Sequence, residues 1–300
     1  MRIRLIPVRY SFLAQEHTGP WNGPLRYMQA GAEQMLANRG LTVTVEPVQL
    51  EASYPDRFQA CAEINKKLAQ AVGQALAAGD FPLVLGGTCD LCLGILSGFD
   101  HAQSGIVWCD AHGDYNIPET SPSGEFVGMP LAIATGHCYQ DLWAQVGNSS
   151  PIPDSRVLMV DVRDLDPPER ISVAHAAIPV VPVSALQEAA PHTEASATLE
   201  SFAARVPNVY LHLDIDVIDP QEAPGVNFPA PGGPSVATME QAIRTLSKRF
   251  HIQMAAMTAF DPDADQDNKT LQAGLRLLAQ LAESIRQPAP PWRLKSRQGA

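Results

Sequence analysis

The feature that most constrains this chain is an apolar run that ends in a cluster of metal-capable side chains. Residues 105–109 (GIVWC) are followed directly by Asp110, His112 and Asp114. A continuous apolar run is typical of a strand buried on both faces, and open parallel sheets bind ligands beyond the carboxyl ends of their strands. A solvated loop with an N-capping aspartate is the simpler alternative. That alternative is disfavoured because the cluster directly continues a buried strand. We therefore expect a functional site at this strand end.

Strand-like runs and helical patterns alternate along the whole chain, which is typical of βαβ units and predicts a mostly parallel sheet. No composition shift or linker divides the sequence, so we expect one doubly wound domain over residues 1–300, with 288–300 as a loose tail. We expect strands at 2–7, 42–48, 82–86, 105–109, 156–161, 178–182, 208–213 and 252–258, and helices at 25–38, 57–78, 89–98, 127–135, 193–205, 237–248 and 268–286.

Charge and composition disfavour several classes of partner. The formal net charge of −11 argues against nucleic acid and anionic membranes. No apolar run reaches the roughly 18 residues of a transmembrane helix, and the apolar run at 1–7 is too short for a signal peptide. Five cysteines, an odd number placed in or beside apolar segments, indicate reduced thiols and a cytoplasmic setting.

A second cluster of acids belongs to the strand-like run at 208–213. His212, Asp214 and Asp216 alternate on one face of this segment. Ionised carboxylates gathered at a sheet end repel one another unless a cation neutralises them. The four aspartates of both clusters and the imidazole of His112 are the inventory of a two-metal site, and hard oxygens with a histidine favour Mn²⁺ over Mg²⁺. For His212, an added donor near the site and a satisfied core histidine are equally open.

A third strand end carries a Gly-Gly turn followed by Cys89, in the segment 83–90 (LVLGGTCD). In isolation this segment indicates a phosphate-cradling turn or a buried structural cysteine. Cys89 and Cys92 have the spacing of a redox pair or of half a zinc site, but no second CxxC motif accompanies them.

Taken together, these motifs resemble the arginase/agmatinase (ureohydrolase) family. Residues 110–116 (DAHGDYN) resemble the family motif Asp-Ala-His-x-Asp, and 213–220 (LDIDVIDP) resemble Asp-x-Asp-x-x-Asp-Pro. The resemblance extends over strand ends from about 83 to 262. It implies a three-layer α/β/α fold with a mostly parallel sheet of about eight strands, hydrolysis of a guanidine- or amidine-type C–N bond, and a homo-oligomer.

The resemblance also implies roles for individual residues at two Mn²⁺ ions. Asp110 and Asp214 would bridge the ions. Asp114 would complete one ion and orient the attacking water, and His112 and Asp216 would complete the other ion.

The remaining matches concern the substrate. The segment 163–169 (RDLDPPE) resembles the one whose acids contact the substrate's α-amino group, which implicates Asp166 and Glu169. Asn116 and Ser123 match family positions at the amino-acid end of the substrate. A small guanidino or amidino compound is therefore the expected partner.

Four departures from the family pattern alter this expectation. Cys89 stands where the family has a metal-binding histidine, so it either remains a ligand with a pH-dependent affinity or leaves one ion loosely held. Val127 replaces a proton-shuttle histidine, and Glu125 replaces an asparagine near the α-carboxylate. Glu125 is then the nearest candidate for the missing acid/base. The glutamate that holds the guanidinium falls at Thr258 or Ala259, neither of which carries a carboxylate.

The loss of the shuttle and of the acidic anchor favours a substrate other than arginine. An N-hydroxyguanidine is less basic than a guanidine, because its oxygen withdraws electron density, and it can bind in its neutral form. The sequence therefore favours an N-hydroxyguanidino amino acid such as N-hydroxyarginine. A metal-binding homologue without hydrolase activity, with a regulatory or partner-binding role, is the main alternative, and amide deacylation is a further one.

Overall fold

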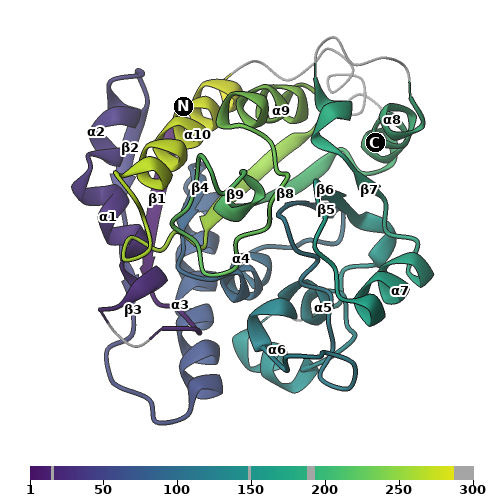
Figure 1. Cartoon of the computed structure of the whole chain (residues 1–300). Coiled ribbons are helices and arrows are strands. Elements are labelled where there is room, and N and C mark those ends of the chain that lie inside the picture. Colours follow the sequence, from purple (N-terminus) through teal and green to yellow (C-terminus); the bar gives the residue numbers. More distant parts are fainter. Residues whose placement is uncertain (15–16, 148–149, 188–192, 287–300) are drawn as a thin grey trace.

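Nine strands form one sheet in the part of the chain that the computed structural model describes, residues 1–14, 17–147, 150–187 and 193–286. The strands lie in the order β2-β1-β4-β9-β8-β5-β6-β7, with β3 paired to β1, and all these pairings are parallel (Figure 1). The strands are β1 (Arg2–Arg9), β2 (Thr42–Val45), β3 (Val48–Gln49), β4 (Phe81–Leu85), β5 (Ser104–Cys109), β6 (Val157–Val160), β7 (Val180–Val181), β8 (Asn208–Asp214) and β9 (His251–Thr258).

Helices cover both faces of the sheet, so the predicted three-layer α/β/α architecture is confirmed. One apolar cluster packs α1, α2, α8, α9 and α10 on one face, and a second packs α3 to α7 on the other. Successive residues of β5 alternate between the clusters, with Val107 in the first and Trp108 in the second. The helices are α1 (Gly23–Gln29), α2 (Ala32–Ala37), α3 (Arg57–Ala77), α4 (Cys92–Ser97), α5 (Pro130–Ala134), α6 (Gln140–Val146), α7 (Pro167–His175), α8 (Glu194–Arg205), α9 (Val236–Arg249) and α10 (Lys269–Ile285).

The predicted elements differ from the observed ones in a few places. The expected helix at 25–38 is two helices, because Gly31 between them adopts a positive φ of 85°. The expected strand at 42–48 is divided into β2 and β3, which is why the sheet has nine strands rather than about eight. The helices α6 and α7 were not predicted, and the expected tail at 288–300 lies outside the described residues.

The sheet order brings separate parts of the chain to one edge. β4, β9, β8 and β5 are neighbours, so the segments that follow them meet at their carboxyl ends. Close approach of the β1 loop requires a glycine after β4, because a Cβ on Gly87 would lie 2.2 Å from the carbonyl oxygen of Tyr10. The loop after β4, which carries Cys89, therefore packs directly against the loop that follows β1.

All five cysteines are free, and four of them are buried. None of the described helices combines the length and apolar character needed to cross a membrane.

Candidate metal centre and active site

A cavity of about 440 Å³ lies at the carboxyl ends of β4, β5, β8 and β9. Ligand pockets usually span about 300–1,000 Å³, so this one suits a small molecule. It gathers every site candidate that the sequence predicted: Cys89, Asp110, His112, Asp114, Asn116, Ser123, Glu125, Asp166, Glu169, Asp214 and Asp216.

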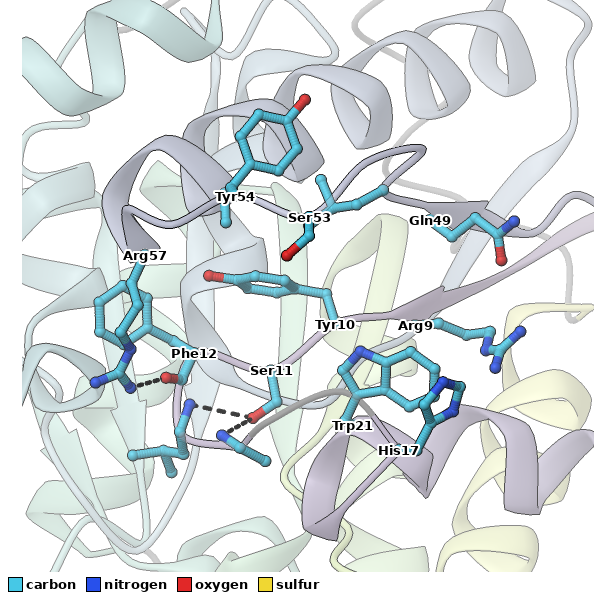
Figure 2. Close-up of a pocket in the computed structure, with 14 residues that line it drawn as sticks. Arg9, Tyr10, Ser11, Phe12, His17, Trp21, Gln49, Ser53, Tyr54 and Arg57 are labelled. Carbon is cyan, nitrogen blue, oxygen red and sulfur yellow. Dashed lines mark hydrogen bonds between the residues drawn. The ribbon is translucent and has the colours of Figure 1, made fainter.

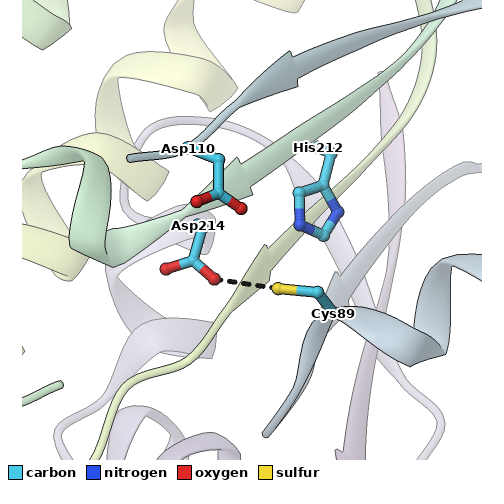
Figure 3. A group of neighbouring side chains, drawn as sticks. All are labelled: Cys89, Asp110, His212 and Asp214. Atoms are coloured by element: carbon cyan, nitrogen blue, oxygen red, sulfur yellow. Dashed lines mark hydrogen bonds between the residues drawn. The ribbon is translucent and has the colours of Figure 1, made fainter. Parts of the chain in front are cut away.

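Two sets of donor atoms at the floor of this cavity are close enough to hold metal ions. The deep group consists of Cys89, Asp110, His212 and Asp214, all buried (Figure 3). The outer group consists of Asp110, His112 and Asp216. Within each group the donor atoms lie within 4.8 Å of one another. Asp110 belongs to both, as expected of a carboxylate between two ions.

The outer group is held together by an imidazole between two carboxylates. His112 Nδ1 lies 3.1 Å from Asp216 Oδ2 and 3.4 Å from Asp110 Oδ1. Burial disfavours the charged ring, but the hydrogen bonds to Asp110 and Asp216 raise the pKa of His112 to about 12. A bound cation would take the place of this proton, because a metal-binding histidine must be neutral.

The deep group is tied by contacts to the Cys89 thiol. The Cys89 Sγ donates a hydrogen bond of 2.8 Å to Asp214 Oδ2 and lies 3.3 Å from Thr258 Oγ1. Burial and the surrounding aspartates raise the pKa of this thiol well above its usual value. Burial also lowers the pKa of His212 to about 3, so its ring is neutral.

The buried carboxylates show why this floor fits cations. Burial and the charge of Asp216 raise the pKa of Asp214 to about 8, while burial and neighbouring carboxylates raise those of Asp110 and Asp216 to about 6. Ionisation of these buried aspartates is therefore unfavourable unless a positive charge lies beside them. Divalent cations remove that repulsion, and oxygen donors with imidazole are a suitable set for Mn²⁺.

Asp114 lies beside both groups but belongs to neither. It follows Gly113, where a Cβ would approach Glu169 Oε1 to 2.5 Å, and it has a positive φ of 47°. Its carbonyl oxygen accepts hydrogen bonds from the first turn of α5, donated by the amides of Leu131 and Ala132. The turn thus fixes the backbone that presents the Asp114 carboxylate to the cavity.

The side of the cavity that would meet the substrate is organised by α7. Asp166 caps the amino end of this helix in a capping box with Glu169. The two oxygens of Glu169 accept the backbone N–H groups of Tyr115 and Asp166, at 2.8 and 3.2 Å. Glu169 therefore joins the metal-motif loop to α7. Burial raises its pKa to about 6.

Asn116 lies in the same wall, beside Asp166. Its Nδ2 donates a hydrogen bond of 3.1 Å to Asp166 Oδ2, whereas its Oδ1 is buried without a hydrogen-bond partner among the described residues. A buried acceptor that lacks a partner is costly, so a ligand's donor would be favourable here.

The departures from the family pattern also face the cavity. Ser123 and Glu125 are exposed at its mouth, and Val127 is half-buried beside them. Of the two positions considered for the missing glutamate, Ala259 lines the cavity, whereas Thr258 is buried against Cys89. The wall at that position is therefore a methyl group rather than an acid.

The sequence missed several residues of the wall. Phe228 and Pro229 follow the β8 loop, and the proline-rich composition there indicated only a loop. Asp164 was not singled out in segment 163–169, yet its Oδ2 lies 3.9 Å from His112 Nε2. The other unpredicted wall residues include Leu13 and Asn227.

A second cavity, of about 780 Å³, lies beside the loop that follows β1 (Figure 2). Arg9 and Arg57 line it, each with its guanidinium over an aromatic ring, and no acid occurs among its lining residues in the described chain. Among the described residues, carboxylates converge at the smaller of these two cavities, which is therefore the candidate metal centre.

Comparisons with known proteins show which family this chain resembles. A model of the arginase family matches residues 1–283. The arginase of Bacillus caldovelox is 36% identical over 227 residues, which are 75% of this chain and 76% of that relative. The arginase of Bacillus subtilis (strain 168) is 34% identical over 219 residues, or 72% and 74% of the two chains. The crystal structure of arginase from Bacillus subtilis subsp. subtilis str. 168 matches with a TM-score of 0.83 at 29% identity, over 95% of this chain and 98% of that one.

The fold and the donor groups define a metal-dependent hydrolase of the ureohydrolase type, which acts on amidino substrates. The chain belongs to the arginase family.

Proposed function

We propose that this protein is a binuclear, Mn²⁺-dependent hydrolase that cleaves the C–N bond of an N-hydroxyguanidino amino acid such as N-hydroxyarginine in preference to arginine. The observation that carries the proposal is the contrast between the floor and the wall of one cavity. The floor has two donor groups that share Asp110, whereas the wall has Ala259 and Val127 where an acid and a base would serve arginine.

The donor set fits the proposed ions. When bound, two Mn²⁺ ions would supply Lewis acidity and a water of lowered pKa between them. Asp110 would be shared between the ions, and the resemblance to the family implies the same for Asp214, which lies in the deep group. Cys89 and Asp114 would complete the deep side, and His112 and Asp216 the outer side. Asp114 is supported in this role by its buried carboxylate, which the turn at Gly113 holds toward the cavity.

The chain's own polar groups would hold the amino-acid end of the substrate. Asn116 Oδ1 has no partner in the described residues and would accept a hydrogen bond from the α-amino group. Asp166, held at the start of α7, would lie opposite the same amino group, and Ser123 would contact the carboxylate at the mouth. Glu169 would act mainly by positioning, since its oxygens already accept two backbone N–H groups.

The substrate preference follows from the wall near Ala259. A guanidinium is cationic, and a methyl group offers no charge to offset its desolvation. An N-hydroxyguanidine is less basic and can bind in its neutral form. Val127 cannot carry a proton, so Glu125 at the cavity mouth is the proposed donor to the leaving amine.

The test compares L-arginine with N-hydroxy-L-arginine on the Mn²⁺-loaded protein, with urea and hydroxyurea as the products measured. We expect kcat/KM to favour the hydroxylated substrate by at least about 100-fold, the ratio that corresponds to one unmatched buried charge or polar group. The substitution Ala259→Glu should move the preference toward arginine, and Ala259→Gln is the matched control without charge. Equal rates on both substrates in the wild type would contradict the proposed preference. Metal binding without hydrolysis of either substrate would support the non-catalytic alternative instead.

A further inference from the structure

His212 belongs to the deep group and is completely buried. It is on β8, two residues before Asp214 and on the same side of the strand. It supplies the single imidazole of the deep group, as His112 does for the outer group. Figure 3 shows its ring facing the Asp214 carboxylate and the Cys89 thiol.

Two contacts fix the orientation of the His212 ring. Its Nδ1 lies 2.8 Å from the hydroxyl of Tyr210, and the indole of Trp108 stacks on it at 3.6 Å with an interplanar angle of 5°. The stack follows from the sheet register, which pairs Trp108 of β5 with His212 of β8. A hydrogen bond to one ring nitrogen is the usual way in which proteins orient a histidine whose other nitrogen binds a metal.

The other nitrogen, Nε2, is poorly satisfied as a core group. Its one hydrogen-bond contact among the described residues is Thr258 Oγ1 at 3.4 Å, which is long for a hydrogen bond. The same hydroxyl lies 3.3 Å from Cys89 Sγ and 3.3 Å from Asp214 Oδ2. Nε2 therefore points into the space that the deep donors surround.

The spacing of the four donors is close to that of a coordination shell. Metal–ligand bonds of about 2.0–2.3 Å place two ligands of one ion at most about 4.6 Å apart. The donor atoms of the deep group lie within 4.8 Å of one another, so a small adjustment would close them on an ion.

We infer that His212 is a ligand of the deep metal ion through Nε2, with Asp110, Asp214 and Cys89, and that Tyr210 holds its ring in place. The inference rests on the proposed two-ion function and adds a ligand that the resemblance to the family does not supply. With His212, the deep site keeps one nitrogen donor even though Cys89 stands where the family has a metal-binding histidine.

The experiment titrates Mn²⁺ into the metal-free wild type and into His212→Gln, with electron paramagnetic resonance as the measure of free ion. We expect the wild type to bind two ions and His212→Gln to bind the second more than about 100-fold more weakly, because loss of a supporting partner alone costs about 10–100-fold. Tyr210→Phe should weaken the same ion by about tenfold. His101→Gln removes a different buried histidine, whose ring nitrogens are hydrogen-bonded to the carbonyls of Leu96 and Ser150, and it should leave both ions unchanged.

A second measurement does not depend on the variants' folding. The Co²⁺-loaded wild type should show a slowly exchanging, strongly shifted N–H proton from His212 Nδ1 in its proton NMR spectrum. Absence of that signal, or unchanged binding of two ions by folded His212→Gln, would overturn the inference while leaving the proposed hydrolase intact. A wild type that binds no metal would instead overturn the proposed function as well.

Discussion

The outer and deep groups share Asp110 but differ in what surrounds them. The outer group has an imidazole that is 25% exposed and lies between two carboxylates. The deep group is wholly buried, and a thiol closes it by donating to Asp214. A thiol must lose its proton before it binds a metal, and burial makes that loss expensive. We therefore expect the two groups to bind their ions with unequal affinity, with the deep ion the weaker.

Loss of the shared carboxylate should have the largest effect. Asp110→Asn removes a charged oxygen donor from both groups at once. We expect both ions to bind more than about 100-fold more weakly, since even a supporting partner costs about 10–100-fold. The metal content, measured by elemental analysis, and the turnover rate should fall together. If the variant retained one full equivalent of metal, the two groups would not share this residue.

A change at Glu125, which lies at the mouth of the cavity, tests proton transfer separately from metal binding at the floor. We expect Glu125→Gln to lower kcat by about 100-fold, the contribution of a general acid, with both metal equivalents kept. Glu119→Gln is the matched control, because it removes an exposed acid of the same loop that is not among the lining residues of the cavity. Equal activity of wild type and Glu125→Gln would assign leaving-group protonation to water.

Metal removal should reverse the pH dependence of stability. In the metal-free protein the folded pKa of Asp214 is about 8 against an ordinary value of 3.8, so the folded state retains a proton that the unfolded chain releases. The free energy of unfolding should therefore fall as pH rises from about 4 to about 8. In the loaded protein the stabilisation by metal should rise over the same range, by about tenfold in affinity per pH unit for each proton released.

Thermal unfolding with and without a chelator checks this sign, and Asp214→Asn, which cannot titrate there, should flatten the metal-free curve. A metal-free protein that becomes more stable toward pH 8 would show that the floor acids are not held protonated.

The smallest expected effect comes from restoring an imidazole at position 89. Cys89→His should bind the deep ion about tenfold more tightly at neutral pH, because a neutral imidazole needs no deprotonation and suits Mn²⁺ better than a thiol. Metal stoichiometry by elemental analysis is the measure. Cys92→Ser, at a buried cysteine outside both groups, is the control. Unchanged occupancy would show that the thiol is already an adequate ligand.

The sequence by itself determined the layered α/β fold and the outer group. Strand and helix periodicity is local, and a strand that ends in an acid cluster needs no knowledge of distant contacts. His112 is two residues from Asp110, and Asp216 follows a second run of the same kind. A single glycine was enough to mislead the prediction at 25–38, because its positive φ separates α1 from α2.

Only the tertiary structure decided the place of His212 in the deep group and the contacts of Glu169. Cys89, Asp214 and Thr258 follow or end β4, β8 and β9, which become neighbours through the sheet order rather than through the sequence. The same order stacks Trp108 on His212, and it changes an undecided core histidine into one whose Nε2 faces the donors. A side chain's partners across a sheet depend on strand order and register, and the local sequence pattern of a single strand determines neither.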